Sequence, residues 1–358
     1  MKKIAVIGIQ GVPAQYGGFE TLVENLIGEK VASDILYTIY CSSKSYSKQL
    51  STYKGAYLKY VPLLANGSQS ILYDIISLLK ATRGNDVILI LGVSGCVFLP
   101  IYRLFSKKRL IINIDGLEHR RDKWGKWTRR FLKYSEKMAV KYADVIVSDN
   151  KGIQGYVLEE YGKLSVLIAY GGDHVLCDIS DIEKEVLQKY ALKGVDYSFS
   201  VCRIEPENNV HITLEAFQKS GKELVFVGNW DKSVYGRELL EKYGQCRNIH
   251  MLSPIYDLKI LNVLRSHCRF YIHGHSAGGT NPSLVEAMFF GKPILAYDVI
   301  YNQETTERQA FYYNSVEELV GLLSKPYEFF NDCGKSMLEI ARRRYCWEHI
   351  AWQYEQLY

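Results

Sequence analysis

The sequence predicts an α/β protein with two doubly wound domains, and three observations support that class. The chain has 358 residues, which is too long for a single hydrophobic core of ordinary size. Short apolar runs alternate with helical patterns along the chain. The same alternation begins again after the stretch at 170–185. We therefore expect two halves, each with a parallel sheet that helices cover on both faces.

The first half contains five short runs of β-branched and apolar residues, as buried parallel strands require. They lie at 4–8, 35–41, 87–92, 110–115 and 145–149, with helical patterns at 19–30 and 128–143. The segment 87–102 lacks charge, but Gly92, Gly95 and Pro100 interrupt it. It therefore predicts a buried strand, a turn and a helix start better than a membrane span.

The second half repeats the pattern. Its predicted strands lie at 197–204, 223–229, 269–275 and 294–299, with helices at 214–220 and from Pro282 onward. We place an N-terminal domain at 1–172 and a C-terminal domain at 173–338. In open α/β sheets, ligands bind beyond the carboxyl ends of the strands, so the loops at those ends are the place to search for a site.

Composition limits the class of protein. Hydrophobic residues at 47% and charged residues at 23% are typical of globular chains and exclude a disordered one. The eight cysteines are scattered, without a CxxC pair. This predicts reduced thiols in a cytoplasm, with neither a disulfide framework nor a zinc site. The net charge of +5 is mild.

The first strand leads into a glycine-rich loop, GIQGVPAQYGGFE. Its spacing departs from GxGxxG, and the second strand ends in Cys41 and Ser42 where a ribose-binding acid is expected, so a nicotinamide cofactor is disfavoured. Gly17 and Gly18 precede a helix and expose N–H groups that suit a phosphate. The alternative is a tight turn between strand and helix.

A second glycine-rich loop, HSAGGTNPSLVEAM, follows the strand at 269–275. Asn281 is the expected helix N-cap, and Pro282 takes the first helical position, where its missing N–H costs nothing. Gly278, Gly279 and Thr280 can bring backbone N–H groups to a phosphate. Glu286 falls away from the apolar helix face, where it can bind sugar hydroxyls or remain a surface acid.

The whole chain resembles GT-B-fold glycosyltransferases of family 4, and specifically their bacterial β-1,4-rhamnosyltransferase subgroup (DUF1972-type). Five motifs in order carry the resemblance: QGVPAQYGGFETLVENL, IDGLEHRRDKWGKW, VCRIEPENN, HSAGGTNPSLVEAM and RYCWEHIAWQYEQLY. The resemblance implies two Rossmann-like domains facing across a cleft, with a C-terminal helix at 339–358 crossing back to the N-terminal domain. It places the donor mainly on the second domain and the acceptor on the first.

The resemblance also assigns donor-binding roles. Glu286 matches the family's ribose-binding acid, and Arg203 matches the arginine that neutralises the donor diphosphate. The family often has a lysine where this chain has Asn208, which we expect to donate a hydrogen bond to the donor without supplying charge. Many members place a sugar-binding glutamate where this chain has Gly278. We expect a remodelled sugar pocket there. The alternative for Arg203 is a structural ion pair with Glu205 or Glu207.

For catalysis, the resemblance implies transfer with retention, in which the leaving diphosphate helps to take the acceptor proton. Asp115 occupies the place where many relatives carry an active-site histidine, and we expect it to accept a hydrogen bond from the acceptor hydroxyl. Glu118 is the alternative residue for this role. Either acid could instead cap a turn, and His119 is interpreted as a loop residue. No metal or cofactor is expected, because no DxD motif lies between the strands.

A basic segment with interleaved tryptophans follows these acids. Such a segment suits an anionic membrane surface that presents a lipid-linked acceptor, although a solvated helix face is the alternative. We predict peripheral association with the inner face of the cell membrane and no nucleic-acid partner. The residues assigned to the acceptor or membrane side are Glu20, Arg120, Arg121, Trp124, Trp127, Arg129 and Arg130.

Three function classes follow. The first is a transferase that moves L-rhamnose from dTDP-rhamnose to a polyprenyl-diphosphate-linked sugar in cell-surface polysaccharide biosynthesis. The second is another GT-B enzyme, either a transferase of a different nucleotide sugar or a nucleotide-sugar epimerase. The third is a non-catalytic nucleotide-sugar-binding protein on the same fold, because fold alone does not determine activity.

Overall fold

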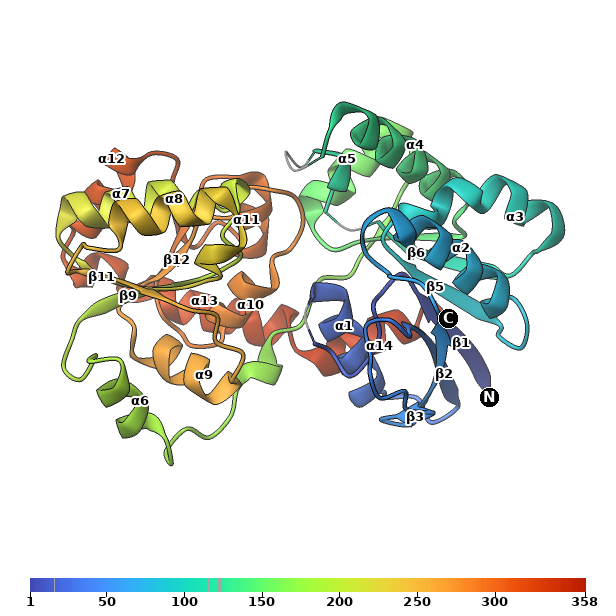
Figure 1. Ribbon diagram of the computed structural model, residues 1–358, viewed down its shortest axis with the longest axis horizontal. Coiled ribbons are helices and arrows are strands. Elements are labelled where there is room, and N and C mark those ends of the chain that lie inside the picture. Colours follow the sequence, from blue (N-terminus) through green and yellow to red (C-terminus); the bar gives the residue numbers. More distant parts are fainter. Residues whose placement is uncertain (16, 115, 121–123) are drawn as a thin grey trace. The chain divides into compact units, whose positions relative to one another are not determined.

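The chain folds into two compact units, each built around one sheet (Figure 1). A computed structural model describes residues 1–15, 17–114, 116–120 and 124–358. Unit 1 comprises Met1–Tyr170 and Trp347–Tyr358, and unit 2 comprises Gly171–Cys346. The two-unit α/β architecture predicted from the alternating pattern is confirmed.

Unit 1 contains an eight-stranded sheet in the order β3-β4-β2-β1-β5-β6-β7-β8. All neighbouring strands are parallel except β3 and β4, which pair antiparallel. The strands are β1 (Lys2–Ile7), β2 (Ile35–Ser42), β3 (Thr52–Tyr53), β4 (Ala56–Val61), β5 (Val87–Leu91), β6 (Arg109–Asn113), β7 (Val145–Ser148) and β8 (Val166–Leu167).

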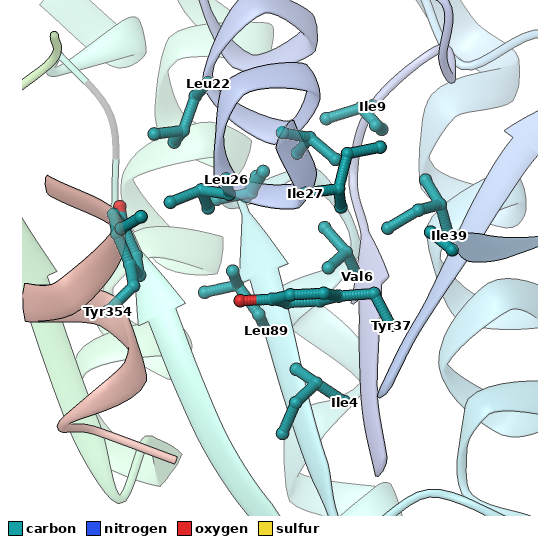
Figure 2. Close-up of a cluster of buried hydrophobic side chains, with 14 of the residues drawn as sticks. Ile4, Val6, Ile9, Leu22, Leu26, Ile27, Tyr37, Ile39, Leu89 and Tyr354 are labelled. Atoms are coloured by element: carbon teal, nitrogen blue, oxygen red, sulfur yellow. The ribbon is translucent and has the colours of Figure 1, made fainter. Parts of the chain in front are cut away.

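Helices cover both faces of this sheet, as a parallel sheet requires. Its α-helices are α1 (Gly18–Gly28), α2 (Ser70–Ala81), α3 (Leu99–Phe105), α4 (Lys126–Tyr142), α5 (Lys151–Tyr161) and α14 (Trp347–Glu355). Figure 2 shows the core beneath α1, where Leu22 and Leu26 belong to the same buried cluster as Val6 and Leu89. Apolar residues recur at every second position of the strands and at every third or fourth position of α1. The two patterns meet in this core, which the sheet and the helix fill from opposite sides.

Unit 2 contains a six-stranded parallel sheet in the order β11-β10-β9-β12-β13-β14. Its strands are β9 (Tyr197–Val201), β10 (Glu223–Val227), β11 (Ile249–Leu252), β12 (Tyr271–His273), β13 (Ile294–Tyr297) and β14 (Phe311–Tyr313). Its α-helices are α6 (Glu183–Lys189), α7 (Val210–Ser220), α8 (Val234–Tyr243), α9 (Leu258–His267), α10 (Pro282–Met288), α11 (Ile300–Thr305), α12 (Val316–Leu323) and α13 (Asn331–Arg344).

Strand order locates the crevice in each sheet. In unit 2 the chain runs outward from β9 through β10 and β11, then returns to add β12 on the other side of β9. In unit 1 the corresponding reversal lies between β1 and β5. Loops leave such a switch point in opposite directions, which opens a crevice at the carboxyl ends of the strands. The loops after β9 and β12, and those after β1 and β5, therefore border the candidate sites.

The segment predicted at 339–358 is divided between the units. Met337 and Ile340 of α13 are buried, and α13 packs against α10 of unit 2, so this helix continues the second core. Only α14 belongs to unit 1. The crossover therefore falls between Cys346 and Trp347, later than the sequence placed it, because the apolar face of α13 is complementary to unit 2.

Hydrogen bonds and burial fix α14 on unit 1. The Glu355 carboxylate accepts from the backbone N–H groups of Val31 and Ala32, each at 2.9 Å. Tyr354 is fully buried beside the core strands, and its hydroxyl accepts from Asn113 Nδ2 at 2.9 Å (Figure 2). A segment distant in sequence thus completes the first core.

The uncharged run at 87–102 forms β5, a 3₁₀ turn (Ser94–Phe98) and the start of α3, as the interrupting glycines and proline predicted. Among the described residues, no helix has the length and apolar character needed to cross a bilayer.

Replacing Tyr354 by alanine should lower the free energy of unfolding by about 3 to 5 kcal/mol, because it leaves a cavity in the core and removes the bond to Asn113. The matched control is Trp352→Ala on the same helix, since Trp352 is 47% exposed and should change stability little. Denaturant unfolding of both variants measures the difference. Equal losses would show that α14 is not anchored through Tyr354.

Candidate functional site

Hydrogen bonds join the two loops that border the crevice of unit 2. Ser276 donates its backbone N–H to the Glu207 carbonyl at 2.8 Å, and Asn209 Nδ2 donates to the Gly274 carbonyl at 2.9 Å. A Cβ at Gly274 would collide with the Asn208 carbonyl, so only glycine allows this close approach. The loop that carries Arg203 and the glycine-rich loop therefore form one structural element.

Arg203 follows β9, and its side chain is exposed. Within the described part of the chain, no ion pair joins its guanidinium to Glu205 or Glu207. Its backbone carbonyl is held in place by Asn208 Nδ2 at 2.7 Å. Arg203 thus presents a cation beside the crevice from a fixed backbone, as a residue that binds phosphate must.

Asn208 is buried, and its side chain is occupied within the protein. Besides the bond to the Arg203 carbonyl, its Oδ1 lies 2.6 Å from His275 Nδ1. Its amide therefore joins the two loops and is unavailable to a donor in this arrangement. Burial lowers the pKa of nearby His273 to about 3, so that imidazole is neutral. Arg203 supplies positive charge at this crevice.

The glycine-rich loop ends at α10 as the sequence predicted. Asn281 Oδ1 accepts from the backbone N–H of Ser283 at 3.0 Å, and Pro282 takes the first helical position. Gly278 is partly exposed, while Gly279 and Thr280 are buried at the loop's base. Leu284, Val285, Ala287 and Met288 face the core, which leaves Glu286 on the opposite side.

The Glu286 carboxylate is held by a buried arginine. Arg265 of α9 is only 3% exposed, and its Nη2 donates to Glu286 Oε2 at 2.5 Å. His174 Nε2 lies 3.6 Å from Glu286 Oε1. Arg265 Nε and Nη1 have no hydrogen-bond partner among the described residues, which makes Glu286 its principal counter-charge. The carboxylate is thus fixed while its side chain keeps 17% of its surface exposed.

In unit 1, carboxylates of α1 stabilise the loop after β1. Gln10 donates its backbone N–H to Glu20 Oε1 at 2.8 Å, and Ala14 donates to Glu24 Oε2 at 2.5 Å. A Cβ at Gly17 would collide with the Glu20 carboxylate. With Glu20 already in the first turn of α1, the environment of Gly17 and Gly18 favours a hydroxyl-bearing ligand over a phosphate.

The loop after β6 holds the acids predicted for catalysis. Asp115 lies outside the described residues. Glu118 begins a 3₁₀ turn (Glu118–Arg120), and its Oε2 accepts from Trp124 Nε1 at 3.0 Å. This contact gives Glu118 a role in holding the turn.

A buried carboxylate anchors the same turn. Glu136 of α4 has 1% of its side chain exposed, and its Oε2 lies 3.0 Å from His119 Nδ1. Its Oε1 accepts from the hydroxyls of Tyr156 at 2.6 Å and Tyr161 at 2.5 Å. His119 is therefore a partly buried polar contact that fixes the loop after β6 to α4 and α5.

The predicted basic segment continues into α4. Arg120 lies over the ring of Tyr156, 4.8 Å from its centroid, and Arg129 Nε donates to the Trp124 carbonyl at 2.8 Å. Trp127 is 80% exposed, with Arg130 5.4 Å from its ring centroid. Arg121 lies outside the described residues.

Comparison with family models divides the chain close to the boundary between the two units. Residues 1–173 match the model "Domain of unknown function (DUF1972)", and residues 182–327 match "Glycosyl transferases group 1". Unit 2 carries a glycosyl transferases group 1 domain. Among curated proteins, none matches the chain at a significant level.

Solved glycosyltransferases share the fold of the whole chain. Sucrose-phosphate synthase from Thermosynechococcus elongatus is 17% identical over 100% of this chain and 98% of its own, with a TM-score of 0.82. Anabaena HepE in complex with UDP-glucose is 15% identical over 99% and 98%, with a TM-score of 0.77. Starch synthase IV from Arabidopsis thaliana, bound to ADP and acarbose, is 13% identical over 99% and 98%, with a TM-score of 0.71. The chain has the GT-B fold.

The glycosyltransferase domain contains the joined loops, Arg203 and Glu286. Across the residues that the structure describes, no three His, Cys, Asp or Glu side chains form a cluster that could hold a metal ion. The crevice thus offers the exposed Arg203 guanidinium and the Glu286 carboxylate, which Arg265 holds in place. Such a set can bind a phosphate and hydroxyl groups.

Sequence reasoning missed Arg265 and Glu136. Each is a charged residue on a helix face that is otherwise apolar: Arg265 lies beside Leu261 and Leu264, and Glu136 beside Leu132. A charge on a predicted buried face was the available signal, because such a charge requires a partner.

Replacing Glu136 by glutamine should lower the free energy of unfolding at neutral pH by about 2 to 4 kcal/mol. Burial alone would raise the pKa of Glu136, but hydrogen bonds from His119, Tyr156 and Tyr161 outweigh it and hold the pKa below 4.5. The ionised carboxylate therefore stabilises the fold above pH 4.5, and this contribution is lost as the pH falls through the lower folded-state pKa.

Denaturant unfolding over a pH series measures this difference. The gap between wild type and Glu136→Gln should narrow in acid, while Glu159→Gln, at an exposed position of α5, should match wild type throughout. A gap independent of pH would contradict the assigned charge state.

Proposed function

We propose that the chain is a retaining glycosyltransferase that moves L-rhamnose from dTDP-rhamnose to a polyprenyl-diphosphate-linked sugar in cell-surface polysaccharide biosynthesis. The observation that carries the proposal is the crevice of unit 2, where the loops after β9 and β12 are joined and the Glu286 carboxylate is fixed by Arg265. The match of residues 182–327 to glycosyl transferases group 1 supports the reaction class.

The proposed donor contacts use groups with complementary charge. Arg203 and the backbone N–H groups of Gly279 to Asn281 receive the diphosphate, and Glu286 accepts hydrogen bonds from the ribose hydroxyls. Because Arg265 already holds one carboxylate oxygen, the ribose meets an acceptor that does not have to reorganise. The remaining sugar contacts come from a pocket with Gly278 in place of an acidic side chain.

The chemical step in this proposal needs no protein nucleophile. The bond from the anomeric carbon to the diphosphate breaks, the acceptor hydroxyl bonds to the same face of that carbon, and its proton passes to a diphosphate oxygen. Arg203 stabilises the negative charge that develops on the leaving group. Asp115 is proposed to receive a hydrogen bond from the acceptor hydroxyl, with Glu118 as the alternative.

Unit 1 is proposed to receive the acceptor at an anionic membrane surface. Glu20 beside Gly17 offers a carboxylate to a sugar hydroxyl, and the basic segment that includes Arg129 and Arg130 supplies charge of the correct sign. These features favour an enzyme with a lipid-linked acceptor over a soluble epimerase or a non-catalytic binding protein.

A donor with a different base and sugar is the second candidate. HepE was solved with UDP-glucose and starch synthase IV with ADP, on the same fold as this chain. Neither Arg203 nor Glu286 distinguishes one nucleoside diphosphate from another, since both would bind groups that all of them share.

A bound donor should stabilise the protein by mass action, by about 2 to 3 kcal/mol at a concentration of about one hundred times its Kd. Thermal unfolding with dTDP-rhamnose, dTDP, UDP-glucose and ADP-glucose measures this effect. We expect the largest shift from dTDP-rhamnose. A shift with UDP-glucose alone would make the rhamnose assignment wrong, and no shift with any nucleotide sugar would contradict the proposed function.

Replacing Glu286 by glutamine should weaken donor binding and also destabilise unit 2, because Arg265 then lies buried without its counter-charge, at a cost of about 3 kcal/mol. The double variant Arg265→Met, Glu286→Gln removes both charges and should recover most of the stability. Donor affinity should stay reduced in the double variant. Recovery of both stability and affinity would exclude Glu286 from the donor site.

A further inference from the structure

A groove in unit 1 lies between α4 and α5. It has a volume of about 540 Å³, and its walls carry four cations and one carboxylate. Figure 1 shows the two helices side by side. The lining residues are Arg129, Arg130, Lys133, Tyr134, Lys137, Glu160 and Tyr161.

Contacts beneath the groove fix one of its cations. Lys133 Nζ lies 2.9 Å from Glu160 Oε1 and within 4.8 Å of the ring centroids of both Tyr156 and Tyr161. Those two tyrosines are themselves held by the buried Glu136 carboxylate. The floor of the groove is therefore a connected polar network and not a set of freely moving surface chains.

Two cations of the groove are available to a ligand. Arg130 and Lys137 lie seven positions apart on α4, so they share a helix face with Lys133. In the part of the chain that the structure describes, neither forms an ion pair, and the one groove carboxylate, Glu160, is engaged by Lys133. The groove therefore has an excess of positive charge that can attract an anionic ligand.

The rim of the groove is aromatic. Trp127 is 80% exposed and Tyr134 is 52% exposed, and both rings lie on α4 next to the cations. On α3, which packs beside α4, Leu104 and Phe105 are also exposed. Large apolar side chains next to cations are typical of a surface that meets lipid headgroups and the upper acyl region.

We propose that the groove between α4 and α5 binds the phosphate headgroup of a lipid, with Arg130 and Lys137 on the phosphate oxygens and Trp127 against the apolar part. The inference rests on the proposed function for a lipid-linked acceptor, and it names the place where such a molecule is held. A guanidinium and an ammonium held on one helix face provide the donors that phosphate oxygens require.

Vesicle co-sedimentation at low ionic strength tests the site. The probe is phosphatidylcholine vesicles with a minor fraction of phosphatidic acid, compared with vesicles of equal charge that contain oleate. Arg130→Gln with Lys137→Gln should weaken binding to phosphatidic acid vesicles about tenfold or more. The matched control removes two charges outside the groove, by Lys80→Gln with Lys141→Gln, and should weaken binding much less.

The oleate vesicles distinguish a phosphate ligand from a carboxylate ligand. Two further measurements distinguish a lipid from a free anion. Inorganic pyrophosphate should compete with the vesicles, and Trp127→Gln should weaken vesicle binding while leaving pyrophosphate binding unchanged. Equal losses in the groove and control variants, equal binding to oleate vesicles, or vesicle binding indifferent to Trp127→Gln would each overturn the proposal. Donor binding by the unmodified protein is measured separately, so a failure here leaves the nucleotide-sugar function standing.

Discussion

The buried ion pair between Arg265 and Glu286 is the interaction on which the candidate donor site depends. Arg265 lies within the packed layer of α9, where an unpaired guanidinium would cost several kcal/mol, so the carboxylate of Glu286 must remain beside it. Glu286 in turn is fixed by α10, whose N-cap ends the glycine-rich loop. The buried Asn208 side chain joins that loop's His275 to the Arg203 carbonyl. Strand order, helix capping and one ion pair thus place a cation and an acid at the same crevice.

The two units present different chemistry at their crevices. In unit 2, the exposed guanidinium of Arg203 favours an anion. In unit 1, Glu20 lies in the first turn of α1 and makes that end of the helix unfavourable for an anion. A cluster of four cations in unit 1 lies instead along α4, beside the Glu136 network. This separation agrees with the proposed division in which unit 2 binds the nucleotide and unit 1 the acceptor.

Much of the fold and part of the site could be predicted from local patterns. The strands follow from apolar residues that alternate with a period of two. The N-cap at Asn281 and the position of Glu286 off the apolar face follow from the helical period of three to four residues. Both periods are local properties of the sequence. Arg265 and Glu136 could not be assigned, because their partners lie 21 and 17 to 25 positions away and meet them only after helices pack. Asn208 was predicted to face the donor, but the close approach of the two loops turns its amide inward. The crossover to α14 was also misplaced, since only packing against α10 shows which core α13 completes.

Amide hydrogen exchange of the full chain, with and without saturating dTDP, tests most directly whether unit 2 binds the nucleotide. The account predicts slower exchange in the loop at 203–209 and in the segment 274–286, with no change along α4 and α5. Unchanged exchange in both loops, or slowing confined to the loop after β1, would contradict it.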